Sequence, residues 1–172
     1  MDDGVHGGQT ELEPRPPERE DLVGLCRTLN DGGCRYLIVG GFALIQTGYP
    51  RLTGDVDVLI DTDPENERRV YEALEYLPDR AVRELEPGDV AKYCVVRVAD
   101  EIIVDLMSSA AGIDYRAAAP DIAWREVDGV RIPFASPRLL WRMKVHTRRA
   151  KDAPDLEFLR HYFAARGEEP PE

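Results

Sequence analysis

Apolar residues along this chain occur both in short continuous runs and at helical spacing. Over residues 22–29 they recur at i, i+3, i+4 and i+7, which predicts one buried face of a helix. The run Tyr36–Val39 predicts a buried strand, and Phe42–Ile45 predicts a short helix that ends at Gly48. Over residues 55–61 the apolar residues Val56, Val58 and Ile60 alternate with Asp55, Asp57 and Asp61, which predicts a strand of period two.

The rest of the chain adds two hairpins and three helices. Ala99-Asp100 and Asp128-Gly129 are turn sequences between β-rich runs, and each predicts a hairpin. We expect strand pairs within residues 93–107 and 124–134, and helices at residues 63–77, 136–151 and 156–163. This order of elements predicts an α/β (α+β) fold, in which helices flank one mixed β-sheet.

Length and composition predict one domain with short tails. A chain of 172 residues suits a single core. We expect residues 1–17, rich in Gly, Pro and charge, to be a disordered acidic tail, residues 18–166 to form the domain, and residues 167–172 to be a short tail. No apolar run approaches the roughly 20 residues that span a bilayer, and the acidic start does not resemble a signal peptide. Three cysteines without a CxxC pair favour a reducing, cytoplasmic location.

The charge of the chain is acidic overall but basic in one place. With 22 Lys+Arg and 33 Asp+Glu, the net charge is −11, which argues against a protein that coats nucleic acid. Residues 136–151 contain six basic residues and no acidic one. Predicted as a helix, this stretch places Lys144, Arg148 and Lys151 on one face. Most of these cations suit a solvated surface, and Lys144, helped by Arg149 or Lys151, is the one that we expect to meet a bound anion.

Three aspartates are candidates for chemistry. Asp55 and Asp57 lie two apart on a predicted strand, so both side chains leave the same face. Asp105 stands among apolar residues, where a carboxylate is costly without a partner. A divalent cation, Mg²⁺ or Mn²⁺, would compensate all three, and such clusters handle triphosphates. The alternatives are a solvated strand face and the Asp-x-Asp pair of some glycosyltransferases.

Gly40-Gly41 lies directly between the first predicted strand and the short helix that follows it. Backbone N–H groups at such a turn can bind a phosphate, aided by the helix N-terminus. The alternative is a tight turn that needs glycine for backbone reasons alone.

Taken together, these motifs resemble a known signature. Gly40-Gly41-Phe42-Ala43 followed by Thr53-Gly54-Asp55-Val56-Asp57-Val58 is similar to the DNA polymerase β-like nucleotidyltransferase superfamily. Within it, Arg51–Asp57 most resembles the minimal nucleotidyltransferases, including the AbiEii-like toxins of bacteria, and Lys144–Leu156 resembles the last motif of that group. The resemblance covers residues 36–160 and implies a nucleotidyltransferase-type sheet with C-terminal helices.

The resemblance also implies an activity and a set of roles. The activity is transfer of NMP from an NTP to an acceptor hydroxyl, on tRNA, protein or a small molecule, with pyrophosphate as the leaving group. A toxin of this group would also have an antitoxin partner. The implied roles are metal binding by Asp55 and Asp57, metal or general-base duty for Asp105, and nucleotide binding by Gly40, Gly41, Thr53, Lys144, Arg149 and Lys151.

Two alternatives remain open at this point. The chain could be a nucleotidyltransferase-fold protein without turnover that acts as a binding or scaffold partner. A glycosyltransferase is less favoured, because the chain has little room for a sugar-nucleotide domain beside an acceptor site. Asp152-Ala153-Pro154-Asp155 is typical of the start of a helix, with Asp152 as the N-cap and Asp155 in the first turn. We expect this structural role rather than a catalytic one, and the two carboxylates could orient Lys144 or Lys151 at the same time.

Overall fold

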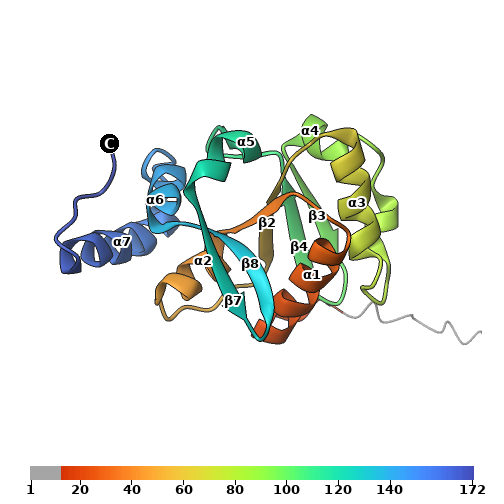
Figure 1. The fold of residues 1–172 in the computed structure, drawn as a ribbon, viewed down its shortest axis with the longest axis horizontal. Coiled ribbons are helices and arrows are strands. Elements are labelled where there is room, and N and C mark those ends of the chain that lie inside the picture. The colour runs from red at the N-terminus through yellow and green to blue at the C-terminus, as the bar shows by residue number, and fades with distance from the viewer. Residues whose placement is uncertain (1–12) are drawn as a thin grey trace, which may run out of the picture.

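The computed structural model describes residues 13–172, which form one mixed sheet with helices packed around it (Figure 1). The sheet has six strands in the order β3-β4-β2-β1-β8-β7, and β5 and β6 pair separately. The strands are β1 (Tyr36–Val39), β2 (Val56–Ile60), β3 (Val95–Ala99), β4 (Ile103–Met107), β5 (Ser109–Ala110), β6 (Ile113–Asp114), β7 (Ile122–Val127) and β8 (Val130–Ala135). The predicted α/β fold on one mixed sheet is therefore confirmed.

The helices lie in two groups. In Figure 1, α1 and α3 lie to the right of β8, while α2, α6 and α7 lie to the left. The helices are α1 (Arg19–Asp31), α2 (Gly40–Thr47), α3 (Pro64–Leu74), α4 (Asp89–Tyr93), α5 (Tyr115–Ala118), α6 (Pro137–Val145) and α7 (Ala153–Ala165), with short 3-10 turns η1 (Ala81–Glu84), η2 (Ala119–Asp121) and η3 (Ala150–Asp152).

The core follows the predicted apolar spacing. On α1 the side chains at the i, i+3, i+4 and i+7 positions are buried, and all four residues of β1 are buried. The strand β2 is buried at every position except Asp57, which is half-buried. Because β1 and β2 form the middle of the sheet, polar groups at their ends lie close to the core and are held rigidly.

Two of the predicted helices end earlier than expected. The helix expected at residues 136–151 ends at Val145, because Arg148 has a positive φ of 51° and η3 begins at Ala150. Lys144, Arg148 and Lys151 therefore do not share a helix face. The helix expected at residues 63–77 also ends early, at Leu74.

Both predicted hairpins are present, although a strand of one of them starts later than expected. The pair β7 and β8 encloses Asp128-Gly129, both with positive φ, as a tight hairpin turn requires. The other hairpin pairs β3 with β4, but Tyr93 belongs to α4 and the strand starts at Val95.

The predicted N-terminal tail is described only in part, because residues 1–12 lie outside the described residues. Of the remainder, Pro17 is buried. The backbone N–H of Arg15 donates to the carbonyl of Glu101 at 2.9 Å, and its guanidinium donates to Asp21 at 2.7 Å. Residues 13–17 therefore contact the domain. Among the helices of residues 13–172, none combines the length and apolarity needed to cross a bilayer.

The turn from β1 into α2 is shaped by the side chains that face it. Gly40 has a φ of +67°, and a Cβ there would collide with the carboxylate of Asp57. A Cβ on Gly41 would lie 2.6 Å from Thr53 Oγ1. The backbone reason for glycine therefore applies at Gly40, which needs a left-handed conformation, and the neighbouring side chains leave no room for a Cβ at either residue.

We predict that Gly40→Ala destabilises the protein by about 2 kcal/mol or more, because the left-handed φ and the collision with Asp57 both oppose a side chain. Gly54→Ala is the matched control, since no heavy atom lies within 4 Å of a Cβ there. Chemical denaturation of the two variants measures the difference. Equal midpoints would show that the turn relaxes without cost.

Candidate active site

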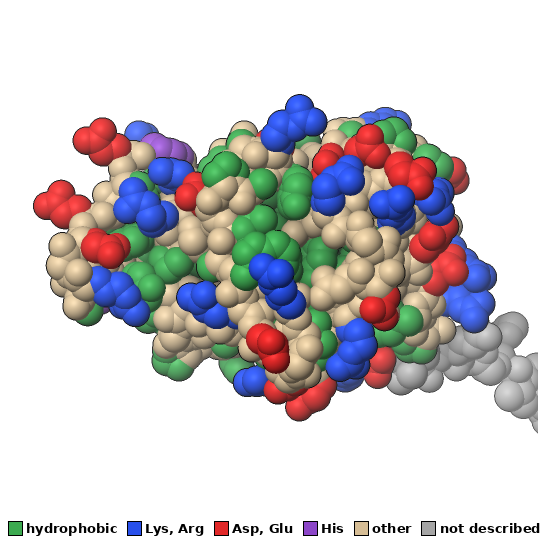
Figure 2. Space-filling view, in the orientation of Figure 1, with side chains coloured by type: hydrophobic (Ala, Val, Ile, Leu, Met, Phe, Trp, Pro, Cys, Tyr) green, Lys and Arg blue, Asp and Glu red, His purple; other side chains and the backbone are tan. Residues whose placement is uncertain are grey.

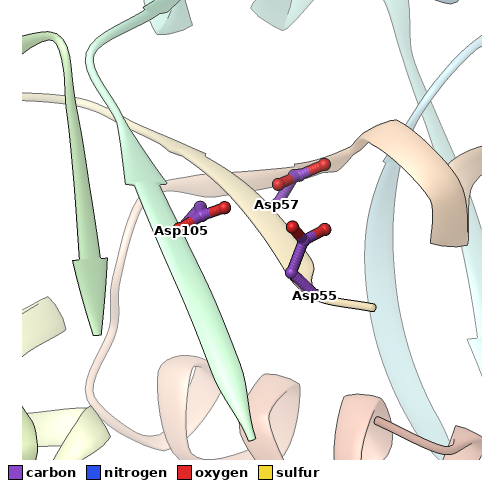
Figure 3. Close-up of side chains that lie close together, drawn as sticks. All are labelled: Asp55, Asp57 and Asp105. Atoms are coloured by element: carbon purple, nitrogen blue, oxygen red, sulfur yellow. The ribbon is translucent and has the colours of Figure 1, made fainter. Parts of the chain in front are cut away.

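Asp55, Asp57 and Asp105 come together because β2 and β4 are parallel neighbours. The register places Asp57 directly beside Asp105, and Asp55 immediately precedes β2. In Figure 3 the three carboxylates face the same space. One carboxylate oxygen from each residue lies within 4.8 Å of the others, so all three could ligate one ion.

The cluster carries more negative charge than it can easily hold. Burial raises the pKa of Asp57 to about 7, and repulsion from Asp55 and Asp105 adds to the rise. Burial likewise raises the pKa of Asp55, followed by repulsion from Asp105. All three donors are hard carboxylate oxygens, which Mg²⁺ and Mn²⁺ favour. The residues present therefore fit a divalent cation by both charge and donor type.

One cation beside the cluster was missed by the sequence analysis. Arg97 on β3 pairs in register with Asp105 on β4. Its Nε donates to Asp105 Oδ1 at 2.9 Å and its Nη2 to Oδ2 at 3.0 Å, while Nη2 lies 3.5 Å from Asp55 Oδ2. The alternating pattern of the hairpin could have indicated this pair, but only once the register was known to a residue.

The cluster lies in a cleft of about 440 Å³. Every residue predicted for the site lines this cleft: Gly40, Gly41, Thr53, Asp55, Asp57, Asp105, Lys144, Arg149 and Lys151. The hydroxyl of Thr53 already donates a hydrogen bond to the backbone carbonyl of Asp55, at 3.0 Å. The structure therefore brings together residues that are up to 111 positions apart in the sequence, from Gly40 to Lys151.

A second cavity of about 410 Å³ adjoins the cleft. Both cavities are bounded by Gly40, Asp57, Met107, Lys144 and Arg149. The remaining wall of the second cavity is mainly apolar, and it includes Val39, Val95, Ala110, Leu140 and Met143. The site thus has a charged compartment and an apolar one, which share a boundary.

The N-terminus of α2 opens onto both compartments. Gly40 is its first residue and Val39 its N-cap, and the side chain of Val39 makes no capping bond to the first turn. The first N–H groups of a helix have no partners within it, and they attract anions. A phosphate at Gly40-Gly41 would therefore meet free donors.

Lys144 is held by two buried acids. Its Nζ lies 3.0 Å from Asp152 Oδ1 and 2.9 Å from Asp155 Oδ2, and only 12% of its side chain is exposed. Asp155 also accepts from Arg51 Nη1 at 2.7 Å, and Asp152 accepts from Arg149 Nε at 2.8 Å. The network fixes three cations along the cleft.

Asp152 does not act as the predicted helix cap. Asp152 occupies the N-cap position of α7, but its side chain accepts no hydrogen bond from the first turn of that helix. Although burial opposes it, hydrogen bonds from Thr147 and Lys144 lower the pKa of Asp152 to about 2. The predicted cap fails because the carboxylate has stronger, cationic partners in Lys144 and Arg149, which precede it in the chain.

The basic side chains do not form a broad surface on the face in Figure 2. Lys and Arg alternate there with Asp and Glu, around an apolar strip. The cations that line the cleft are instead matched by carboxylates lining the same cleft. This arrangement suits a small anion better than a coated polyanion.

Comparisons with known proteins support the fold. No protein-family model matches the chain, and no curated protein matches its sequence. A crystal structure from Thermotoga maritima, provisionally described as a nucleotidyltransferase, aligns with a TM-score of 0.54 at 16% identity, over 81% of this chain and 89% of that one. An antigenic nucleotidyltransferase-like protein from Paracoccidioides brasiliensis aligns with a TM-score of 0.52 at 18% identity, over 88% of this chain and 78% of that one. The chain therefore has a nucleotidyltransferase-like fold.

We predict that the metal-free protein loses stability as the pH rises from 5 to 8. Asp57 has a raised folded pKa of about 7, so its contribution is present at low pH and is lost as the folded carboxyl ionises. Asp57→Asn resembles the protonated form, so the stability gap between this variant and the natural protein should widen with pH, by on the order of a few kcal/mol at most. Denaturation in chelator at several pH values measures the gap.

The control for this pH series is Asp31→Asn, which removes an exposed carboxylate at the end of α1. This variant leaves the three clustered carboxylates in place, so it should not reproduce the widening gap expected of Asp57→Asn. A pH-independent gap for Asp57→Asn would contradict the repulsion within the cluster.

We also predict that Asp155→Asn destabilises the protein by on the order of 3 kcal/mol, because it removes the carboxylate shared by Lys144 and Arg51. Asp128→Asn is the matched control, since Asp128 forms an ion pair with Arg19 that is exposed to solvent and therefore contributes little to stability. Urea denaturation of both variants separates the two cases. Similar losses would mean that the buried network contributes no more than a surface pair.

Proposed function

We propose that this chain is a divalent-metal-dependent nucleotidyltransferase that transfers NMP from an NTP to an acceptor hydroxyl. The observation that carries the proposal is the meeting of three carboxylates with the Gly40-Gly41 turn in one cleft. Carboxylates alone are common on protein surfaces. Here they line the same cleft as the N-terminus of α2 and Lys144. The carboxylates suit the metal ion of a metal–triphosphate ligand, and the helix N–H groups and the lysine suit its phosphates.

Asp55 and Asp57 would hold the metal, and Asp105 is the third candidate ligand or the base for the acceptor hydroxyl. The metal, when bound, would neutralise charge on the phosphate under attack. The raised pKa of Asp57, caused first by burial, supports this role, because a nearby dication would favour the ionised form. Asp105 is buried on the internal strand β4, which limits the directions that its carboxylate can take.

The two compartments would divide the nucleotide between them. Gly40, Gly41 and Lys144 would bind the phosphates, with Arg149 and Lys151 beside them. The base and ribose would occupy the adjoining apolar cavity against Leu140 and Met143. Because Lys144 borders both compartments, it stands where the triphosphate would pass from one to the other.

The proposal specifies the chemical class of the acceptor, a hydroxyl group, and no particular molecule. A hydroxyl on tRNA, on a protein or on a small molecule would meet the requirement of the reaction, and the resemblance to AbiEii-like toxins adds a toxin role with an antitoxin partner. The acidic net charge of −11 gives no broad attraction for RNA, so an RNA acceptor would have to be recognised at the cleft itself.

We predict that α-labelled NTP, Mg²⁺ and either total RNA or cell lysate will yield a labelled macromolecule or small product. Asp55→Asn/Asp57→Asn should reduce labelling by at least about a hundredfold, because it removes two charges that hold the metal. Asp31→Asn/Asp79→Asn removes two exposed carboxylates outside the cleft and should label normally. Scintillation counting after gel and thin-layer separation measures transfer.

The outcomes separate the two functions in competition. Labelling that survives the Asp55/Asp57 double substitution would contradict the proposal. Nucleotide binding by the natural protein without transfer to any acceptor would support the alternative, a binding or scaffold protein that keeps the fold and has lost turnover.

A further inference from the structure

Arg97 is in direct contact with two of the three clustered carboxylates. Its guanidinium engages both oxygens of Asp105, at 2.9 and 3.0 Å, and reaches Asp55 at 3.5 Å. Two of the three candidate metal ligands thus share one protein cation. The pair with Asp105 is a two-pronged guanidinium–carboxylate contact, the strongest common form of such a bond.

The two partners differ in how tightly they are fixed. Asp105 is only 5% exposed and lies on an internal strand of the sheet. The side chain of Arg97 is 57% exposed and projects from β3, the edge strand. Asp105 therefore cannot leave the cluster without disturbing the core, whereas the Arg97 side chain can turn into solvent without moving the backbone, provided that another cation takes its place on Asp105.

A dication on Asp105 would face this guanidinium at close range. Two positive groups on one carboxylate repel each other, and the repulsion is stronger in a partly buried cleft than in water. Either the metal binds Asp55 and Asp57 against this repulsion, or Arg97 gives up Asp105.

We propose that Arg97 competes with the divalent cation for Asp105, and that metal binding displaces its guanidinium from the cluster. The inference rests on the proposed metal-dependent function and assigns to Arg97 a role that sets metal affinity. In the free protein, Arg97 offsets the charge of the carboxylates, so the cluster is held together but binds metal weakly.

Titration calorimetry with Mn²⁺, without nucleotide, tests the competition. Arg97→Gln should bind Mn²⁺ at least about tenfold more tightly than the natural protein, because the competitor is gone. Lys151→Gln removes one positive charge from the same cleft, but Lys151 makes no ion pair in the described structure. That control should change the affinity by no more than about threefold, which separates competition from loss of charge alone.

A second measurement follows the guanidinium itself. The Nε–H resonance of Arg97, assigned by its absence in Arg97→Gln, should report the hydrogen bond to Asp105 in the metal-free protein. Saturation with Mg²⁺ should shift it toward the position of a solvated arginine. A resonance that stays in place when Mg²⁺ is bound would overturn the displacement.

The failures can be told apart. If the natural protein and Arg97→Gln bind Mn²⁺ equally, or if Arg97→Gln binds more weakly, Arg97 does not compete and the metal site stands without it. If neither binds Mn²⁺, the carboxylates hold no metal and the proposed metal-dependent function fails together with the inference.

Discussion

The parallel pairing of β2 with β4 is the constraint on which the site depends. It fixes Asp57 beside Asp105 with no freedom to separate, since both strands lie inside the sheet. Like charges at this distance in a partly buried place are unfavourable, and the raised pKa of Asp57, due first to burial and then to its neighbours, expresses that cost. The cations around the cleft, Arg97 and Lys144 among them, offset this concentration of negative charge.

These two cations differ in how firmly their side chains are held. Arg97 approaches from the edge strand with an exposed, displaceable side chain. Lys144 approaches from α6 and is held in place by Asp152 and Asp155, so its charge is fixed rather than free. A fixed cation suits a ligand that must be oriented, and a displaceable one suits a position that a metal ion could take over.

The sequence predicted the parts of this site that depend on local order. Period two in residues 55–60 placed two aspartates on one face, and Gly40-Gly41 marked the turn, because both features lie within a few residues. The sequence also indicated that Asp152 and Asp155 could orient Lys144, and Asp152 lies only eight residues from Lys144. It did not indicate the turn at Arg148, whose positive φ ends the expected helix early. Nor did it indicate the contact of Arg51 with Asp155, because these residues are 104 positions apart and no short window contains both.

The geometry of the site bears on the two enzyme classes that the Asp-x-Asp pair left open. A pair of aspartates on one strand fits a glycosyltransferase and a nucleotidyltransferase equally well. A third aspartate from a parallel neighbour, with a glycine turn entering a helix on the other side, is a more specific arrangement, and it occurs here within a nucleotidyltransferase-like fold. At 16–18% identity that likeness establishes architecture alone. The case for nucleotide chemistry therefore rests on what this chain places in its own cleft: carboxylates for a metal, helix N–H groups for phosphate, and an apolar cavity beside them.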